Sequence, residues 1–307
     1  VSSAASDVYK RQGFIGSNLV DLLIQKGHEV IVVDNFSTGK KENCNKKAQY
    51  FTLDISKESN LDSIKSIISN VDGVFHLAAF PRVQESIKNP LIFEKNNTLG
   101  TLNILNACSE MNIKRIVYSS SSSAYGNELK LPLKENGKIN PISPYAAQKY
   151  YGEIYCKMFS QIYNLETVSL RYFNVYGERQ SLDGAYTLVI STFVKQRLNN
   201  QPLTIRGDGE QRRDFTHVSD IANANILAME SNEVGKGEVI NIGSGINRSI
   251  NEIANMIGGS KINIDPVIEP RETLADNKKA EELLNWKPRI NIEDWIPKYK
   301  KDLGIID

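Results

Sequence analysis

Short apolar runs alternate with helical patterns along most of the 307-residue chain, and this alternation limits the possible folds more than any other feature. The runs that predict strands lie at residues 30–33, 50–53, 73–79, 116–119, 167–170 and 239–242. Continuous apolar runs of this kind suit parallel strands that are buried on both faces. Expected helices separate most of them, notably 13–26, 91–111 and 145–163. Strands that alternate with helices form βαβ units, so we predict an α/β fold with a Rossmann-type, doubly wound parallel sheet.

The pattern changes beyond Phe173, where helices are separated by glycine and proline turns. The expected helices of this part lie at residues 186–198, 218–229, 250–257, 277–285 and 294–302. We therefore predict a nucleotide-binding domain at residues 1–173 and a smaller, mostly helical substrate lobe at 174–307. The segment near 213–242 is expected to return to the first domain.

Charge, hydropathy and cysteine content argue against several classes of protein. The chain has 37 basic and 36 acidic residues and no long basic run, so we do not expect nucleic acid as a partner. No run approaches the roughly 18 apolar residues that span a membrane, and the first twelve residues lack the apolar core of a secretory signal. Three scattered cysteines (Cys44, Cys108 and Cys156) indicate neither a disulfide framework nor a metal site, and they favour a reducing cytoplasm.

The run Gly13-Phe14-Ile15-Gly16 precedes an apolar helix, as the turn after the first strand of a dinucleotide-binding sheet does. Asp34 ends the second expected strand, 21 residues after Gly13, where a carboxylate can accept hydrogen bonds from the adenosine ribose. A carboxylate there repels a 2′-phosphate, which favours NAD over NADP. The alternative is that Asp34 only caps a turn. Asp54 and Ile55 could hold the adenine edge, although Asp54 could equally form a turn.

The segment before Gly13 does not match such a turn. The pattern Thr-Gly-x-x-Gly-x-x-Gly would place its threonine at Tyr9 and its first glycine at Lys10. Lysine does not easily adopt the positive φ of the tight turn, and residues 2–7 are unlike a buried central strand. We interpret residues 1–12 as a foreign or artefactual N-terminus that replaced the strand and the turn. The alternative is a genuine loss of NAD binding in a non-catalytic relative.

Tyr145 and Lys149 lie four residues apart on an expected helix that opens at Ser143-Pro144, so both side chains project from one face. A lysine ammonium beside a phenol favours the phenolate and lowers its pKa, which would make Tyr145 a base near neutral pH. A hydroxyl from the serine-rich stretch 118–126 could share the substrate proton. Taken alone, a Tyr-x-x-x-Lys pair is more often a solvated face of a helix, and a serine run is more often a loop.

Several motifs occur together in this chain. They are Asp34-Asn35-Phe36-Ser37-Thr38-Gly39, His76-Leu77-Ala78-Ala79, Tyr145-x-x-x-Lys149, Arg171-Tyr172-Phe173-Asn174-Val175-Tyr176-Gly177 and Arg212-Arg213-Asp214-Phe215-Thr216-His217-Val218. With the glycine turn, they resemble the extended short-chain dehydrogenase/reductases, the NAD-dependent epimerase/dehydratase family. The chain is most similar to the UDP-glucose and UDP-N-acetylglucosamine 4-epimerases, from residue 13 to about residue 300.

The resemblance implies NAD as the cofactor, a UDP-sugar as the substrate and no metal. It makes Tyr145 the base, Lys149 its pKa tuner and nicotinamide-ribose ligand, and Ser121 the hydroxyl that binds the sugar 4-OH. The implied cofactor contacts are Gly13, Phe14, Ile15, Gly16, Asp34, Asn35, Ser37, Gly39, Asp54, Ile55, Leu77, Ala78, Ala79, Asn97, Tyr145, Lys149 and Tyr172. The implied substrate contacts are Ser121, Ser122, Tyr145, Asn174, Arg213 and Arg271. Relatives commonly form homodimers through the helices at 91–111 and 145–163.

Two of these substrate contacts have alternatives. Arg213 is expected on the diphosphate, but it could instead form a surface ion pair with Asp214 or Asp208. The family usually has Arg-Pro-Gly-Asp or Arg-Pro-Gly-Glu where this chain has residues 266–271. The second diphosphate arginine would then fall at Pro266, and Arg271 is the candidate replacement.

Related dehydratases place an Asp-Glu pair directly after the catalytic hydroxyl, and related decarboxylases generally keep an acidic residue there. This chain has Ser122 and Ser123 at those positions, and neutral hydroxyls cannot act as the additional acid and base. We therefore expect a UDP-hexose 4-epimerase that works through a 4-keto intermediate. The alternatives are a 4,6-dehydratase, a decarboxylase, or a non-catalytic UDP-sugar-binding relative. The residues do not separate plain from N-acetylated hexoses.

The N-terminal interpretation predicts that repair of the first turn strengthens NAD binding. A variant that begins Val-Thr-Gly-Gly-Ala-Gly in place of the present turn should bind NAD more tightly, because the first glycine lets backbone amides reach the pyrophosphate. Calorimetric titration of both chains with NAD measures the difference. Equal and tight binding by both chains would contradict the prediction.

Overall fold

The computed structural model describes residues 2–3, 13–37, 41–182, 188–267 and 269–305. Within them, seven strands form one parallel sheet in the order β11-β6-β5-β4-β1-β2-β3. These strands are β1 Ser2–Ser3, β2 Ile31–Asp34, β3 Gln49–Thr52, β4 Gly73–His76, β5 Arg115–Ser121, β6 Glu166–Tyr172 and β11 Lys236–Ile242. The predicted doubly wound α/β fold is confirmed. The strand order reverses between β1 and β4, which is the point where such sheets bind ligands.

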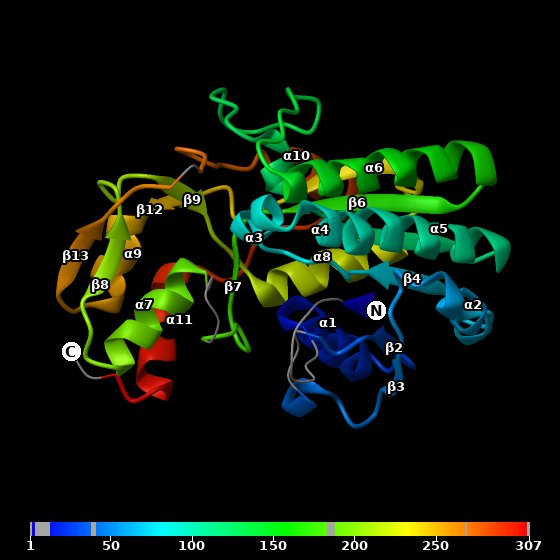
Figure 1. The fold of residues 1–307 in the computed structure, drawn as a ribbon, viewed down its shortest axis with the longest axis horizontal. Coiled ribbons are helices and arrows are strands. Elements are labelled where there is room, and N and C mark those ends of the chain that lie inside the picture. Colours follow the sequence, from blue (N-terminus) through cyan, green and yellow to red (C-terminus); the bar gives the residue numbers. More distant parts are fainter. Residues whose placement is uncertain (1, 4–12, 38–40, 183–187, 268, 306–307) are drawn as a thin grey trace.

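Helices cover both faces of this sheet (Figure 1). One face packs against α2 Leu61–Ile68, α5 Gly100–Glu110 and α6 Pro144–Tyr163, in a core that includes Ile64, Ile104 and Phe159. The other face packs against α1 Phe14–Gln25, α8 Val218–Glu230 and α10 Lys278–Leu284, in a core that includes Leu19, Ile221 and Leu284. Burial of both faces explains why the strands are apolar along their whole length. None of the described helices is both long and apolar enough to cross a membrane.

The helix expected at residues 91–111 is interrupted in the structure. It begins as α4 Pro90–Glu94, continues as a π-helical turn at Lys95–Leu99 and ends as α5. A π-helical turn inserts an extra residue into the helix and is often found at functional sites. Here it contains Asn97. The expected strand 73–79 also ends early, at His76, and α3 Val83–Lys88 follows it.

The prediction that residues 2–7 are unlike a central strand was wrong for Ser2 and Ser3. These two residues form β1, which pairs in parallel with both β2 and β4. Pairing in a parallel sheet uses backbone N–H and C=O groups, which serine provides as well as valine does. Tyr9 and Lys10 lie outside the described residues, so the interpretation of residues 1–12 as foreign stays a prediction.

A second group of elements lies beside the large sheet (Figure 1). Helices α7 Val189–Leu198, α9 Ile250–Ile257 and α11 Ile292–Asp302 share a core that includes Phe193, Ile253 and Trp295. Three two-stranded sheets complete it: β7 Val175–Tyr176 with β10 Thr216–His217, β8 Leu203–Arg206 with β13 Lys261–Ile264, and β9 Arg212–Asp214 with β12 Asn247–Ser249. Between them, α8 and β11 belong to the large sheet and its cover. The division of the chain at residue 173 stays a prediction.

Helix α6 is seated closely on β5. The Ser143 hydroxyl accepts a hydrogen bond from the Ala146 amide at 3.2 Å, and Pro144 occupies the first turn, so the helix begins where its sequence predicts. A Cβ atom at Gly152 would lie 2.3 Å from the Tyr118 ring, so only glycine permits this approach. The seating brings the first turns of α6 to the carboxyl end of β5.

Candidate active site

The structure brings together the three side chains that the sequence singles out as catalytic. The Ser121 hydroxyl lies close enough to the Tyr145 phenol to lower its pKa, and the Lys149 ammonium donates a 2.6 Å hydrogen bond to the Ser119 carbonyl. Lys149 Nζ also lies 5.0 Å from the centre of the Tyr118 ring. Tyr145 and Lys149 are buried, with 8% and 4% of their surfaces exposed. A phenol, a hydroxyl and an amine therefore meet at the carboxyl end of β5, beside the switch point of the sheet.

The expectation that Lys149 lowers the pKa of Tyr145 was wrong for this structure. Burial raises the pKa of the Tyr145 phenol above its usual value, and the hydrogen bond with Ser121 only partly offsets this. Burial lowers the pKa of Lys149 from its usual 10.5 to about 7, against smaller opposing effects of Cys156 and Glu153. The reason for the difference is geometric, because the Lys149 ammonium is directed at the carbonyl of Ser119.

Asn97 is fixed by three hydrogen bonds rather than free for a ligand. Its Oδ1 accepts from the Phe80 amide at 2.7 Å, and its Nδ2 donates to the Phe80 carbonyl at 3.2 Å and to Gln148 Oε1 at 3.0 Å. The side chain thus ties the π-helical turn to the segment after β4 and to α6. Its role near the nicotinamide stays a prediction, and Gln148 and Phe80 are partners that the sequence did not reveal.

The start of α1 and the end of β2 fit the two ends of a dinucleotide. Gly13 caps α1 in an extended conformation, with no side-chain cap and no acidic residue in the first turn that includes Phe14, Ile15 and Gly16. The first amides of such a helix suit a phosphate. Asp34 is buried, and its Oδ1 accepts a 2.7 Å hydrogen bond from the Phe36 amide. Asp34 therefore caps a turn, and its contact with the ribose stays a prediction.

Some of the other residues expected to bind the cofactor form turns, and others are part of the core. Asn35 Oδ1 accepts hydrogen bonds from the amide and hydroxyl of Ser37, while Gly39 lies outside the described residues. Asp54 forms a turn, because its Oδ1 accepts from the Ser56 amide at 2.9 Å and the Ser56 hydroxyl at 2.7 Å. Ile55, Leu77, Ala78 and Ala79 follow the ends of β3 and β4, and Ile55 and Ala78 are core residues.

Tyr172 is anchored on the α8 side of the sheet. Its hydroxyl is hydrogen-bonded to the Ser119 hydroxyl at 2.9 Å and donates to Asn225 Oδ1 at 2.8 Å. Tyr172 therefore stiffens the same stretch of β5 that receives Lys149. A direct contact of Tyr172 with the cofactor stays a prediction.

The two arginines expected on the diphosphate are both paired with carboxylates. Arg213 is buried and forms a 2.8 Å ion pair with Glu269, not with Asp214 or Asp208 as the alternative from sequence supposed. Arg271 is exposed and binds Asp208 through two hydrogen bonds of 2.8 and 2.9 Å. Both arginines lie on neighbouring strands of backbone, since the Arg212 amide donates to the Arg271 carbonyl.

Asp214 organises the floor beside these arginines. Its carboxylate accepts hydrogen bonds from the Ser244 amide at 2.6 Å, the Ser244 hydroxyl at 2.7 Å, and the amides of Gly245 and Ala275 at 3.0 Å each. Asn174 Nδ2 donates to the Asp214 carbonyl at 3.2 Å. One carboxylate thus joins β9 to the loop after β11 and to the segment before α10.

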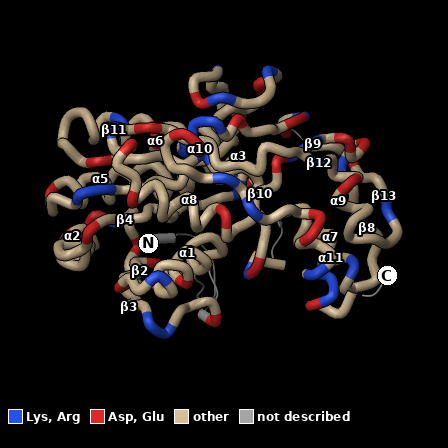
Figure 2. The backbone as a smooth tube through the Cα atoms, turned by 180° about the vertical axis from the view of Figure 1, so that it is seen from behind, with Lys and Arg blue, Asp and Glu red and all other residues tan. Residues whose placement is uncertain are grey.

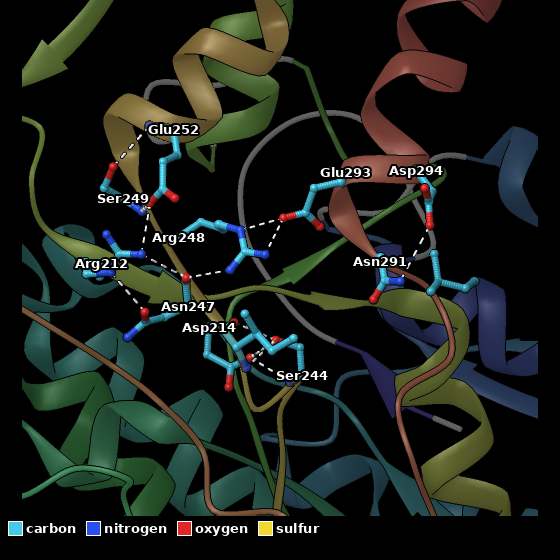
Figure 3. Close-up of polar contacts among 12 residues, drawn as sticks. Arg212, Asp214, Ser244, Asn247, Arg248, Ser249, Glu252, Asn291, Glu293 and Asp294 are labelled. Atoms are coloured by element: carbon cyan, nitrogen blue, oxygen red, sulfur yellow. Dashed lines mark hydrogen bonds and ion pairs between the residues drawn. The ribbon is translucent and has the colours of Figure 1, made fainter.

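Ion pairs between elements surround this floor (Figure 3). Arg212 of β9 pairs with Glu252 of α9 at 3.0 Å, and Arg248 of β12 pairs with Glu293 of α11 at 2.5 Å. Basic and acidic positions are interspersed over both halves of the molecule, with no stripe of one sign along the described backbone (Figure 2). The basic groups of this lobe are therefore local and matched, as suits a small anionic ligand.

A doubly wound parallel sheet that carries a Tyr-Ser-Lys cluster at its strand ends defines a nucleotide-dependent enzyme of the short-chain dehydrogenase type. The chain belongs to the NAD dependent epimerase/dehydratase family, whose model matches residues 11–243. It is 42% identical over 292 residues to a putative UDP-glucose 4-epimerase of Methanocaldococcus jannaschii, covering 92% of this chain and 93% of the relative.

Two further similarities show the range within the family. The UDP-N-acetylglucosamine 4-epimerase of Methanobrevibacter ruminantium, solved in complex with UDP-N-acetylmuramic acid, superposes with a TM-score of 0.89 at 36% identity. That match covers 97% of this chain and 99% of the other. UDP-glucuronic acid decarboxylase 1 of Arabidopsis thaliana is 34% identical, over 94% of this chain and 67% of the relative.

Sequence reasoning assigned no role to a buried ion pair beneath the cluster. Glu153 on α6 and Arg171 on β6 are both almost completely buried and form a two-point hydrogen-bonded pair. The signal was present, because Glu153 follows Lys149 by one helical turn and Arg171 opens one of the family motifs.

The lowered pKa of Lys149 predicts a pH dependence of stability. Because the pKa is about 7 in the folded protein and 10.5 when solvated, the unfolded chain binds more protons between these values. Stability should therefore rise with pH across this window. We expect the free energy of unfolding of the wild type to rise by about 2 kcal/mol between pH 7 and 9 relative to Lys149→Met. Urea denaturation of both proteins across this range measures it; parallel curves would contradict the prediction.

Proposed function

We propose that the protein is a UDP-hexose 4-epimerase that inverts C4 of a UDP-sugar through a 4-keto intermediate, with NAD bound. The observation that carries the proposal is that Tyr145 lies near Ser121, and Lys149 donates to the Ser119 carbonyl, at the carboxyl end of β5. Family membership supports NAD as the cofactor. The start of α1 at Gly13, which has no side-chain cap, and the carboxylate of Asp34 at the end of β2 support contacts with the pyrophosphate and the ribose.

The residues divide the chemistry in a simple way. Tyr145 takes the proton of the sugar 4-OH. The Ser121 hydroxyl forms a hydrogen bond with the same oxygen and positions it for this transfer. NAD, when bound, would supply the acceptor and the donor for the C4 hydride. Lys149, whose ammonium donates to the Ser119 carbonyl, would bind the nicotinamide ribose. Because the pKa of the Tyr145 phenol is raised in the absence of ligands, the phenol must lose its proton before it can act as the base.

The substrate lobe would hold the UDP part firmly and the hexose loosely. Arg213 and Arg271 would provide the cations for the diphosphate. Asn174 is close to Arg213, because its Nδ2 donates a hydrogen bond to the carbonyl of the next residue, Asp214. The 4-keto intermediate has to rotate within the site between the two hydride transfers. Its binding energy should therefore come from the UDP part, which is remote from the reaction, and not from contacts to the reacting sugar ring.

Serines at positions 122 and 123 speak against the other reactions of the family. Elimination of water needs an additional acid and base next to the catalytic hydroxyl, and Ser122 and Ser123 offer only neutral groups. The decarboxylase relative keeps that reaction as the second candidate, because it matches this chain over nearly its whole length. Incubation with UDP-glucuronic acid and analysis for UDP-pentose tests the second candidate directly.

The choice between hexoses needs an assay of both pairs. The purified protein should be denatured and analysed by mass spectrometry for NAD that co-purifies with it, and then supplied with UDP-glucose and with UDP-N-acetylglucosamine in parallel. Conversion of either sugar to its 4-epimer supports the proposal. UDP-sugar binding with neither NAD nor turnover would instead favour the non-catalytic relative.

Removal of the Tyr145 hydroxyl should abolish turnover selectively. In Tyr145→Phe we expect kcat to fall by roughly 10²–10⁴-fold, because no base remains within reach of the 4-OH. The affinity for UDP should stay within about twofold of the wild type, since the ring and its packing are retained. Tyr163→Phe, at the exposed end of the same helix, is the matched control and should retain full activity. Turnover of Tyr145→Phe at the wild-type rate would refute the assignment of the base.

We also propose that the protein works as a homodimer in a reducing cytoplasm. Its three cysteines are free thiols. Apolar side chains are exposed on α4 and the π-helical turn (Leu91, Ile92 and Leu99) and on α6 (Ile154, Met158, Ile162 and Tyr163). Helices α4 and α6 pack against each other, so these side chains can form one apolar face. A second copy of the chain, packed helix against helix, would remove this face from water.

The dimer proposal predicts that one charge on each helix separates the subunits. Leu91 is 83% exposed and Ile162 is 64% exposed, so Leu91→Glu/Ile162→Glu should fold normally and sediment as a monomer. Ile246→Glu alters another exposed apolar residue, 52% exposed, in the other lobe, and it should remain dimeric. Analytical ultracentrifugation distinguishes these states. A wild type that is monomeric at every concentration tested would exclude the dimer.

A further inference from the structure

A buried ion pair links α6 and β5, the two elements that carry the catalytic residues, to the neighbouring strand β6. Glu153 lies on α6, one turn after Lys149, and Arg171 lies on β6. Arg171 Nε donates to Glu153 Oε1 at 2.8 Å, and Arg171 Nη2 donates to Oε2 at 2.6 Å. Each side chain is only 3% exposed. A pair held at two points and shielded from water fixes α6 relative to β6 in both distance and orientation.

The same carboxylate also holds β5. The Ser120 hydroxyl donates to Glu153 Oε1, in addition to the bond from Arg171. Ser120 lies between Ser119, whose carbonyl accepts from the Lys149 ammonium, and Ser121, whose hydroxyl lies close enough to Tyr145 to lower the pKa of the phenol. In the sheet, Ser120 stands directly opposite Arg171. One carboxylate is therefore hydrogen-bonded to the middle residue of the short stretch that contacts both catalytic groups of α6.

The guanidinium has its own support. Its central carbon lies 4.6 Å from the centre of the Tyr125 ring, which provides a cation–π contact. Tyr125 in turn donates a 2.7 Å hydrogen bond to Asn241 Oδ1 on β11. Arg171 thus has a contact that does not depend on Glu153. The pair behaves as a fixed point beneath the catalytic residues.

Glu153 is the negatively charged group near Lys149, because the other described titratable groups around Lys149 are neutral near pH 7. The groups that face Lys149 are Tyr145 and Cys156 from α6, Tyr118 from β5 and His76 from β4. Burial raises the pKa of the Cys156 thiol to about 12 and raises those of the two phenols, so all three are neutral near pH 7. Burial also lowers the pKa of His76 to about 3, so the imidazole is neutral too. Among these described neighbours, Glu153 is the carboxylate that can stabilise the ammonium form of Lys149, in addition to the hydrogen bond to the Ser119 carbonyl and the contact with the Tyr118 ring.

We propose that Glu153, held by Arg171, is a positioning residue of the catalytic centre: it fixes the Ser119–Ser121 stretch against α6 and provides the negative charge that Lys149 faces. The kinetic part of this inference rests on the proposed epimerase function. The placement of Glu153 and its effect on Lys149 do not, and they can be measured without any substrate.

The substrate-free test is the titration of Lys149. Protein labelled with ¹³C at lysine Cε gives one NMR signal for each lysine, and the signal missing from Lys149→Met identifies Lys149. In Glu153→Gln, which still accepts from Ser120, we expect the midpoint to fall by about one pH unit or more relative to the wild type, because an anion beside the ammonium is lost. Glu153→Asp keeps the charge at a greater distance and should recover part of the shift.

The chain contains a matched control for this change. Arg115 and Glu166 form another ion pair between β5 and β6, at the opposite ends of the same strands, with Arg115 buried and a 2.6 Å contact. Glu166→Gln removes a carboxylate from an arginine in the same way, but far from Lys149 along the strands. It should leave the Lys149 midpoint and kcat unchanged.

Loss of Glu153 alone leaves a buried guanidinium without a partner, which is strongly destabilising. If Glu153→Gln does not fold, Glu153→Gln/Arg171→Met removes both charges and should fold, because apolar replacement of a buried pair is often tolerated. A smaller fall in the Lys149 midpoint is expected in the double variant, because the loss of the Arg171 cation offsets part of the loss of the Glu153 anion. A midpoint equal to that of the wild type, in whichever of the two variants folds, overturns the inference.

The kinetic test uses UDP-glucose and UDP-N-acetylglucosamine. For Glu153→Gln we expect kcat to fall by roughly tenfold or more, KM to stay within about twofold, and the alkaline limb of the pH profile to move to lower pH. Equal losses of kcat in Glu153→Gln and Glu166→Gln would mean a general structural effect and would overturn the inference. A wild type inactive on both sugars, but with the expected shift of Lys149, would refute the proposed function and leave this inference standing.

Discussion

The contact between α6 and β5 is the constraint on which the site depends. Gly152 lets the helix approach the Tyr118 ring so closely that no other residue fits there. This approach buries Tyr145 and Lys149 together, and burial is the main cause of both of their pKa shifts. A phenol with a raised pKa and an amine with a lowered pKa are both neutral more often than they would be in water. Burial therefore favours the neutral forms of Tyr145 and Lys149 in the absence of ligands. The positive charge of the nicotinamide ring and the negative charge of the substrate can change this balance.

Much of the fold follows from the sequence pattern, because burial on both faces leaves a simple signal. The apolar runs of β2, β3, β5, β6 and β11 could be read directly, and the start of α6 was fixed by Ser143 and Pro144. The π-helical turn around Asn97 could not be predicted, since an inserted residue does not disturb the apolar pattern of a helix. The strand at Ser2 and Ser3 was missed for the opposite reason. Its pairing comes from backbone groups, whereas the prediction considered side chains.

The site was predictable in its members but not in its electrostatics. The spacing of Tyr145 and Lys149 on one helix predicted that they lie together, and the serine run predicted a hydroxyl near them. The direction of the Lys149 ammonium toward the Ser119 carbonyl has no signature in the sequence, so the shift of the Tyr145 pKa was predicted with the wrong sign. The partner of Arg213 was also missed, because Glu269 lies 56 residues away and meets it only through the pairing of segments in the substrate lobe.

The pairing of Arg213 with Glu269 has a consequence for the exchange of nucleotides. If Arg213 binds the diphosphate, as proposed above, its buried guanidinium has to exchange the Glu269 carboxylate, which it holds at 2.8 Å, for the ligand. Coulombic attraction in such an exchange is largely cancelled, since one anionic contact is broken for each one made. When the diphosphate departs, Glu269 can return to the cation it leaves behind. The internal carboxylate thus lowers the net affinity and eases dissociation, which favours rapid turnover over tight retention of product.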